Sequence, residues 1–136
     1  MERLGTGYVV YGDDVETLRF DWGKVKILSE PAVTGAGRFS FGMVVLEPGK
    51  GHDRHNHPDA DEIIFVMSGE GDQMIDDEPP VRVRSGASIY IPQGVYHSTI
   101  NRTWEPLRLL VVYSPPGSER LLREIPGCEV VPAGEH

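Results

Sequence analysis

The stretch Gly51–Gly71 reads GHDRHNHPDADEIIFVMSGEG, and it contains three of the five histidines of this 136-residue chain. His55 and His57 are separated by one residue, so on an extended strand both rings point to the same side. Two neighbouring imidazoles disfavour protonation of one another and leave ring nitrogens that can bind a divalent metal. The stretch therefore predicts a metal site, with the carboxylate of Glu62 as a third ligand.

A fourth ligand is expected from the second half of the chain. His97 lies in PQGVYHSTIN, directly after a turn that contains proline and glycine, and it can fold back from a neighbouring strand. Three imidazoles and one carboxylate suit Mn, Fe, Co, Ni or Zn better than Ca or Mg. On an octahedral ion these four ligands leave two positions for water, oxygen or substrate. The predicted ligands are His55, His57, Glu62 and His97.

Two spaced motifs, at residues 49–69 and 86–101, resemble the two motifs of the cupin superfamily. The first is Gly49-x5-His55-x-His57-x4-Glu62-x6-Gly69, and the second is Gly86-x5-Pro92-x-Gly94-x2-His97-x3-Asn101. The resemblance implies a single domain over residues 1–136, folded as an all-β double-stranded β-helix, a barrel of the jelly-roll kind. It also implies that one divalent transition metal lies inside the barrel on the four predicted ligands, and that the chain forms a homodimer through edge strands.

Turns rich in glycine and proline divide the chain into short runs of β-branched and aromatic residues, a spacing typical of an all-β sandwich or barrel. Further strands are expected at 39–46, 62–67, 81–84, 88–91, 97–101 and 107–113, and one more at 7–12. A short helix is expected at Glu119–Ile125, and the tail from Pro126 is expected to be loose.

The segments Glu62–Met67 and Asp72–Asp76 flank the sequence SGEG, which predicts a hairpin with a two-residue loop. In that hairpin Val66 lies opposite Gln73 and Ile64 lies opposite Ile75. Gln73 then faces the barrel interior near Glu62, where it becomes a candidate for substrate contact.

Other candidate site residues follow from their position beside the predicted ligands. The candidates for substrate contact are the polar Gln73 and Thr99, and the apolar Ile64, Val66, Ile75 and Ile91. Asp59 and Asp61 are candidates for orienting a ligating imidazole, as carboxylates beside metal sites often do. His52 is a candidate for supporting the ligands or for contacting substrate, and solvated positions are an open alternative for all three. Glu62 is also a candidate catalytic proton carrier, provided that it loosens from the metal.

Charge and composition exclude several classes of partner. A formal net charge of −8 argues against binding to nucleic acid or to an anionic membrane. Cys128 is the only cysteine, so no disulfide can form within the chain. No signal peptide is visible, and no apolar run is long enough to cross a bilayer. A soluble cytoplasmic domain that binds a small-molecule substrate is the expectation.

The family resemblance leaves the reaction open, because one fold serves many activities. The interpretation favoured by the sequence is a mononuclear metal enzyme, a dioxygenase or decarboxylase, acting on a small organic acid or a phenolic compound with Fe or Mn as its metal. One alternative is a non-redox lyase, cyclase or isomerase, to which Zn would be suited. The other is a cupin that binds a small metabolite without turning it over.

Overall fold

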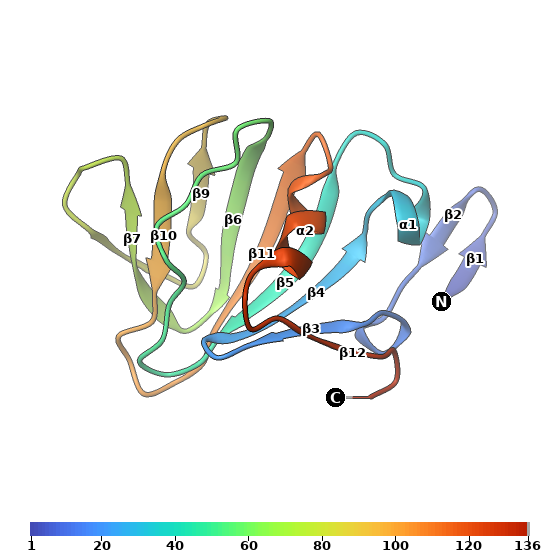
Figure 1. Ribbon diagram of the computed structural model, residues 1–136, viewed down its shortest axis with the longest axis horizontal. Coiled ribbons are helices and arrows are strands. Elements are labelled where there is room, and N and C mark those ends of the chain that lie inside the picture. The colour runs from blue at the N-terminus through green and yellow to red at the C-terminus, as the bar shows by residue number, and fades with distance from the viewer. Residues whose placement is uncertain (136) are drawn as a thin grey trace.

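The computed structural model describes residues 1–135, and short antiparallel strands form most of its regular secondary structure (Figure 1). The strands are β1 (Glu2–Leu4), β2 (Gly7–Val9), β3 (Thr17–Phe20), β4 (Gly23–Ser29), β5 (Ser40–Leu46), β6 (Asp61–Ser68), β7 (Glu70–Ile75), β8 (Val81–Arg84), β9 (Ser88–Ile91), β10 (His97–Ile100), β11 (Leu107–Ser114) and β12 (Glu129–Val131). The helical turns are η1 (Gly12–Asp14), α1 (Pro31–Thr34), α2 (Ser118–Leu121) and η2 (Leu122–Glu124).

Two sheets build the body of the molecule. The larger sheet has the strand order β12-β3-β4-β5-β11-β6-β9, and the smaller has the order β10-β7-β8. Alternate residues of the large sheet point inward, as Leu107, Leu109 and Val111 do on β11. Ile75 and Val83 of the small sheet pack against the same apolar core. The predicted all-β barrel with a short C-terminal helix is confirmed, and that helix is the α2–η2 segment.

The two ends of the chain are more ordered than the sequence suggested. β2 falls within the strand predicted at 7–12, and it pairs with β1 in a hairpin that extends from the body (Figure 1). The prediction of a loose tail is wrong, because β12 pairs with β3 and Val131 is buried against the barrel. Among the described residues, no helix has the length and apolar character needed to cross a membrane.

The predicted hairpin between Glu62–Met67 and Asp72–Asp76 is wrong. β6 pairs with β11 and β9, so that Ile64 lies between Val111 and Ile89, whereas β7 belongs to the other sheet. The chain turns a corner at Gly69, whose φ of 88° favours glycine. A Cβ atom there would lie 2.5 Å from the carbonyl oxygen of Pro106, so no larger residue fits.

Asn101 fixes the loop between β10 and β11. Its side chain is fully buried, and its Nδ2 donates to the carbonyl oxygens of Leu46 (3.1 Å) and Glu105 (2.7 Å). Its Oδ1 accepts from the backbone N–H (2.9 Å) and the hydroxyl (2.8 Å) of Thr103. Every hydrogen-bonding direction of the amide is used, which explains why asparagine stands here.

We predict that Asn101→Ala lowers the free energy of unfolding by about 2–3 kcal/mol, because buried backbone groups lose their partners. Urea denaturation followed by circular dichroism measures the change. Trp104→Ala is the matched control in the same loop, since that side chain is 89% exposed, and it should change the stability by less than about 0.5 kcal/mol. Equal losses in both variants would contradict a specific role for the amide.

Candidate metal centre

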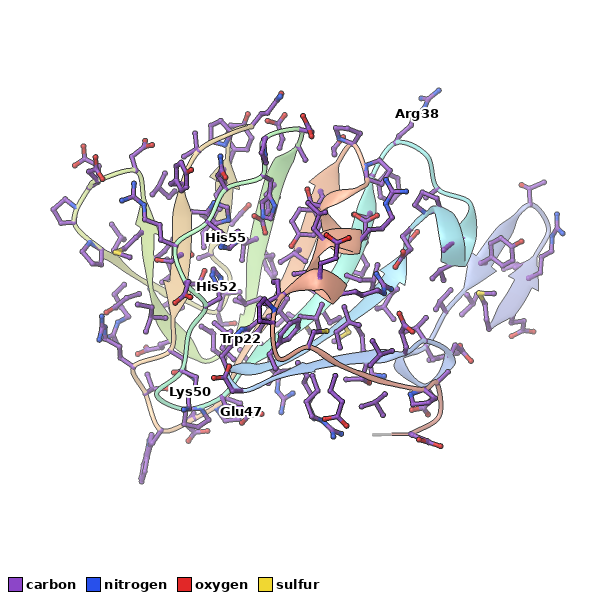
Figure 2. The ribbon with its side chains drawn as sticks, viewed as in Figure 1. Trp22, Arg38, Glu47, Lys50, His52 and His55 are labelled. Carbon is purple, nitrogen blue, oxygen red and sulfur yellow. The ribbon has the colours of Figure 1, made fainter. Side chains whose placement is uncertain are left out.

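Four side chains from three parts of the chain meet inside the barrel. His55 and His57 lie on the segment between β5 and β6, Glu62 lies on β6, and His97 begins β10. One potential ligand atom of each residue lies within 4.8 Å of those of the other three. Figure 2 shows His52 and His55 on that connecting segment, in the region of Trp22. The two motifs, separate in sequence, thus supply one cluster.

The histidine pair is not part of a regular strand, contrary to the simplest interpretation of its spacing. His55 forms an isolated antiparallel bridge with His97, and residues 56 and 57 lie outside any strand. The backbone is extended enough for the rings of His55 and His57 to lie 4.8 Å apart, centroid to centroid. A single bridge to His97 therefore positions the histidine pair, where the sequence analysis expected a regular strand.

Three buried atoms of the cluster lack a hydrogen-bond partner among the described residues: Nε2 of His57, Nε2 of His97 and Oε1 of Glu62. The two nitrogens approach that oxygen to 3.2 Å and 2.9 Å, without the geometry of a hydrogen bond. Buried polar atoms are rarely left unpaired. A divalent transition metal bound by all three would supply the missing partner, so the donor set fits such an ion.

Backbone carbonyls orient two of the rings. Nδ1 of His97 donates to the Val95 carbonyl at 3.0 Å, and Nδ1 of His55 donates to the Asp53 carbonyl at 3.0 Å. In each neutral ring this leaves Nε2 as the lone-pair atom that a metal needs.

The acidic residues named for this orienting role make other contacts. Asp61 accepts a hydrogen bond from the backbone N–H of Gln93 at 2.8 Å, and Asp59 is exposed. Among the described residues, neither makes a hydrogen bond or ion pair with the four-residue cluster. The carbonyls of Asp53 and Val95, which sequence patterns do not reveal, hold the imidazoles instead.

Electrostatics at the cluster favour a cation. Burial lowers the pKa of His55 to about 4, so its ring is neutral at pH 7. Burial alone would raise the pKa of Glu62, but the contacts with His57 and His97 outweigh it and lower that pKa to about 2. Burial likewise would lower the pKa of His97, and the Glu62 carboxylate outweighs it and raises that pKa. The cluster is thus built around one buried negative charge.

A cavity of about 370 Å³ opens onto this cluster. His52 lines it, with its ring centroid 4.6 Å from that of His55 and 6.0 Å from that of Trp22. Burial lowers the pKa of His52. The remaining lining residues, besides His55, His57 and Glu62, are Trp22, Val25, Val44, Asp53, Asn56, Ile64, Leu109, Val111, Tyr113, Ser118, Leu121, Leu122 and Ile125.

One of the six predicted substrate contacts lines the cavity. Ile64 lines the cavity, whereas Val66, Ile75, Ile91, Gln73 and Thr99 are not among its lining residues. Gln73 and Thr99 face inward, as expected, but they lie opposite one another on β7 and β10, and the Thr99 hydroxyl donates to Gln73 Oε1 at 2.6 Å.

Sequence reasoning missed several residues of the cavity. Trp22 comes from the turn between β3 and β4, Tyr113 comes from β11, and the α2–η2 segment contributes Leu121 and Leu122. Only Tyr113 had a local signal, because it continues the alternation of buried positions along LRLLVVY.

We predict that the purified protein binds one Zn²⁺ or Mn²⁺ ion per chain, and that Glu62→Gln weakens this binding by at least about tenfold, because the buried anionic ligand is lost. Isothermal titration calorimetry measures both affinities. Asp61→Asn removes the neighbouring exposed carboxylate and should leave the affinity unchanged. The cluster is not the metal site if Asp61→Asn weakens binding as much as Glu62→Gln does.

Comparisons with known proteins agree with the fold. Protein SchB of Streptomyces halstedii is 32% identical over 107 residues, which cover 79% of this chain and 77% of SchB. The polyketide synthase CurC of Streptomyces cyaneus is 29% identical over 108 residues, which cover 79% of this chain and 69% of CurC.

Solved structures show the same architecture. The polyketide cyclase RemF of Streptomyces resistomycificus superposes with a TM-score of 0.70 over 80% of both chains, at 23% sequence identity. Residues 42–113 match the family model for the cupin domain, a range that contains all four residues of the cluster. The chain belongs to the cupin family.

Proposed function

We propose that this cupin is a metal-dependent enzyme whose substrate is a largely apolar, oxygen-bearing molecule, a phenolic or polyketone compound of one to three rings. The favoured reaction is a cyclisation that forms a carbon–carbon or carbon–oxygen bond through an enol, without molecular oxygen. The phenolic substrate class is the one expected from the sequence. The reaction is the non-redox alternative named there, a cyclase, in place of the dioxygenase or decarboxylase.

The lining of the cavity carries the proposal. Most of its side chains are apolar or aromatic, and neither lysine nor arginine is among them. A small organic dianion would find no cationic side chain there to balance its second carboxylate, and an unpaired buried charge is costly. A neutral ring system gains from the same walls, and the volume of about 370 Å³ is within the range of small-molecule sites.

The aromatic wall suits a planar substrate. Trp22 stacks on Phe20 with ring centroids 4.5 Å apart and an angle of 5° between the planes, so the Phe20 ring supports one face of the indole. Ile64 and Val111, adjacent on β6 and β11, add a flat aliphatic surface. These side chains would hold the rings and exclude water from the polar end of the cavity.

The polar end would handle charge and protons. A divalent metal held by His55, His57, Glu62 and His97 would act as a Lewis acid on a substrate oxygen and stabilise enolate charge. Nδ1 of His52 donates to the Asp53 carbonyl at 3.2 Å, and its Nε2 has no hydrogen-bond partner among the described residues. His52 would accept a proton at Nε2 from a substrate in the cavity.

The relatives add support for the substrate class. CurC is described as a polyketide synthase, and its match covers 79% of this chain. RemF is described as a polyketide cyclase, although at 23% identity its likeness extends to the fold alone.

An oxygen-dependent reaction is the second candidate, because the donor set favours it as well. Three imidazoles and one carboxylate suit iron and manganese as well as zinc. A dioxygenase would use the same apolar cavity for a phenolic substrate, and it would differ by consuming oxygen.

We predict that protein loaded separately with Zn²⁺, Mn²⁺, Fe²⁺, Ni²⁺ or Co²⁺ accelerates the anaerobic cyclisation of 1-(2-hydroxyphenyl)-1,3-butanedione. The phenol oxygen attacks the distal carbonyl, and loss of one water gives 2-methylchromone. The reason is that a β-diketone provides metal-binding oxygens and an enolisable carbon in an apolar frame. Absorbance spectra and liquid chromatography follow the product, and an oxygen electrode records uptake in a parallel aerobic run.

Glu62→Gln should abolish the acceleration, and Asp61→Asn should retain it. Oxygen uptake with ring or chain cleavage would replace the cyclase with a dioxygenase. Tight binding of the diketone without turnover under either atmosphere would indicate a cupin that binds metabolites without converting them.

A further inference from the structure

Tyr113 stands beside the metal centre, and no ligand role or proton transfer has been assigned to it. It lies directly opposite Glu62 in the ladder between β11 and β6, and both side chains are buried on the inner face of the sheet. Its ring centroid lies 4.9 Å from that of His57, at an angle of 64° between the planes. Tyr113 is therefore a neighbour of two candidate ligands and one wall of the cavity.

The hydroxyl of Tyr113 makes no hydrogen bond with any described residue. The side chain is only 6% exposed, and buried tyrosine hydroxyls usually find a partner. The hydroxyl oxygen keeps a small exposed surface. In this it differs from the fully enclosed atoms without a partner, such as Nε2 of His57 and Oε1 of Glu62. The side chain to which this oxygen belongs lines the cavity.

Packing does not explain the hydroxyl. The inward residues of β11 are Leu107, Leu109, Val111 and Tyr113, so three of four positions are aliphatic. Phenylalanine would fill the same volume and continue the apolar row without leaving a polar atom unpaired. The hydroxyl therefore indicates a role other than packing, and a ligand in the cavity would supply the partner that it lacks among the described residues.

Two other polar side chains of the cavity already donate one hydrogen bond each to a backbone carbonyl. Nδ2 of Asn56 donates to the Gly94 carbonyl at 3.2 Å, and Nδ1 of His52 donates to the Asp53 carbonyl. A tyrosine phenol ordinarily carries its proton at pH 7. Tyr113 thus offers a free O–H donor a short distance from the metal centre.

We propose that Tyr113 donates a hydrogen bond to a second oxygen of the substrate while a first oxygen occupies the metal centre. Tyr113 is then a specificity-determining residue that selects compounds with two separated oxygen functions over compounds with one. The inference rests on the proposed function for its substrate class, but it concerns binding and not turnover.

The test compares four probes on Zn²⁺-loaded protein by absorbance titration. The first is 1-hydroxy-2-acetonaphthone, whose hydroxyketone can reach the metal. The others carry one additional hydroxyl at position 6, 7 or 8 of the second ring. On the natural protein, at least one hydroxylated probe should bind roughly three- to tenfold more tightly than the parent, the value expected for one neutral hydrogen bond.

Tyr113→Phe should erase this preference and leave the affinity for the parent probe within about twofold. Tyr90→Phe is the matched control, since that ring is on the outer face of β9 and is exposed, and it should keep the preference. A preference that survives in Tyr113→Phe, or that never appears with any of the three probes, would overturn the proposal. An equal loss for all four probes together with a lower melting temperature would assign Tyr113 to packing and overturn it too.

Because the readout is binding, the test is separate from that of the proposed function. A preference that depends on Tyr113, found without any cyclisation, would uphold this inference and reject the cyclase. Cyclisation that is unaffected by Tyr113→Phe, with unchanged probe preferences, would do the reverse.

Discussion

Two backbone hydrogen bonds between His55 and His97 hold the polar centre of this barrel together. The N–H of His55 donates to the carbonyl of His97 at 3.0 Å, and the N–H of His97 donates back at 2.8 Å. They fasten the segment between β5 and β6 to the first residue of β10. Since Glu62 belongs to the large sheet and His97 to the small one, the cluster forms only where the two sheets and this segment meet.

The sequence was sufficient for the cluster because residue type and spacing determine it. Imidazole and carboxylate groups have few alternative uses at that density, and the two motifs located all four residues before any pairing of strands was known. The pairing itself was not accessible. SGEG is as compatible with a tight hairpin as with a corner, and the choice depends on how closely Gly69 approaches Pro106, a contact between residues far apart in sequence. The tail was misjudged for the same reason, because β12 is short and is stabilised by its distant partner β3.

The substrate side of the site shows the limit of motif reasoning most clearly. Trp22, His52 and Tyr113 come from three separate segments, and only the folded barrel brings them together around one cavity. Gln73 and Thr99 illustrate the converse. Both are polar and inward-facing, as expected, yet their mutual hydrogen bond gives each a partner away from the cavity lining. Inward direction alone therefore does not identify a substrate contact; a free donor or acceptor at the cavity wall is also needed.

The centre keeps its geometry in the metal-free protein. Nε2 of His57 and Nε2 of His97 lie 3.2 Å and 2.9 Å from Oε1 of Glu62, and these contacts favour the carboxylate although none has the geometry of a hydrogen bond. The arrangement persists because the His55–His97 bridge and the carbonyls of Asp53 and Val95 fix the backbone and two of the rings independently of any ion. A cation that binds there meets donors already in place, so little ordering entropy opposes it and the recovered pairing adds to the stability of the fold. Metal affinity and barrel stability are therefore coupled through the same few atoms, whereas the apolar walls are free to vary with the substrate.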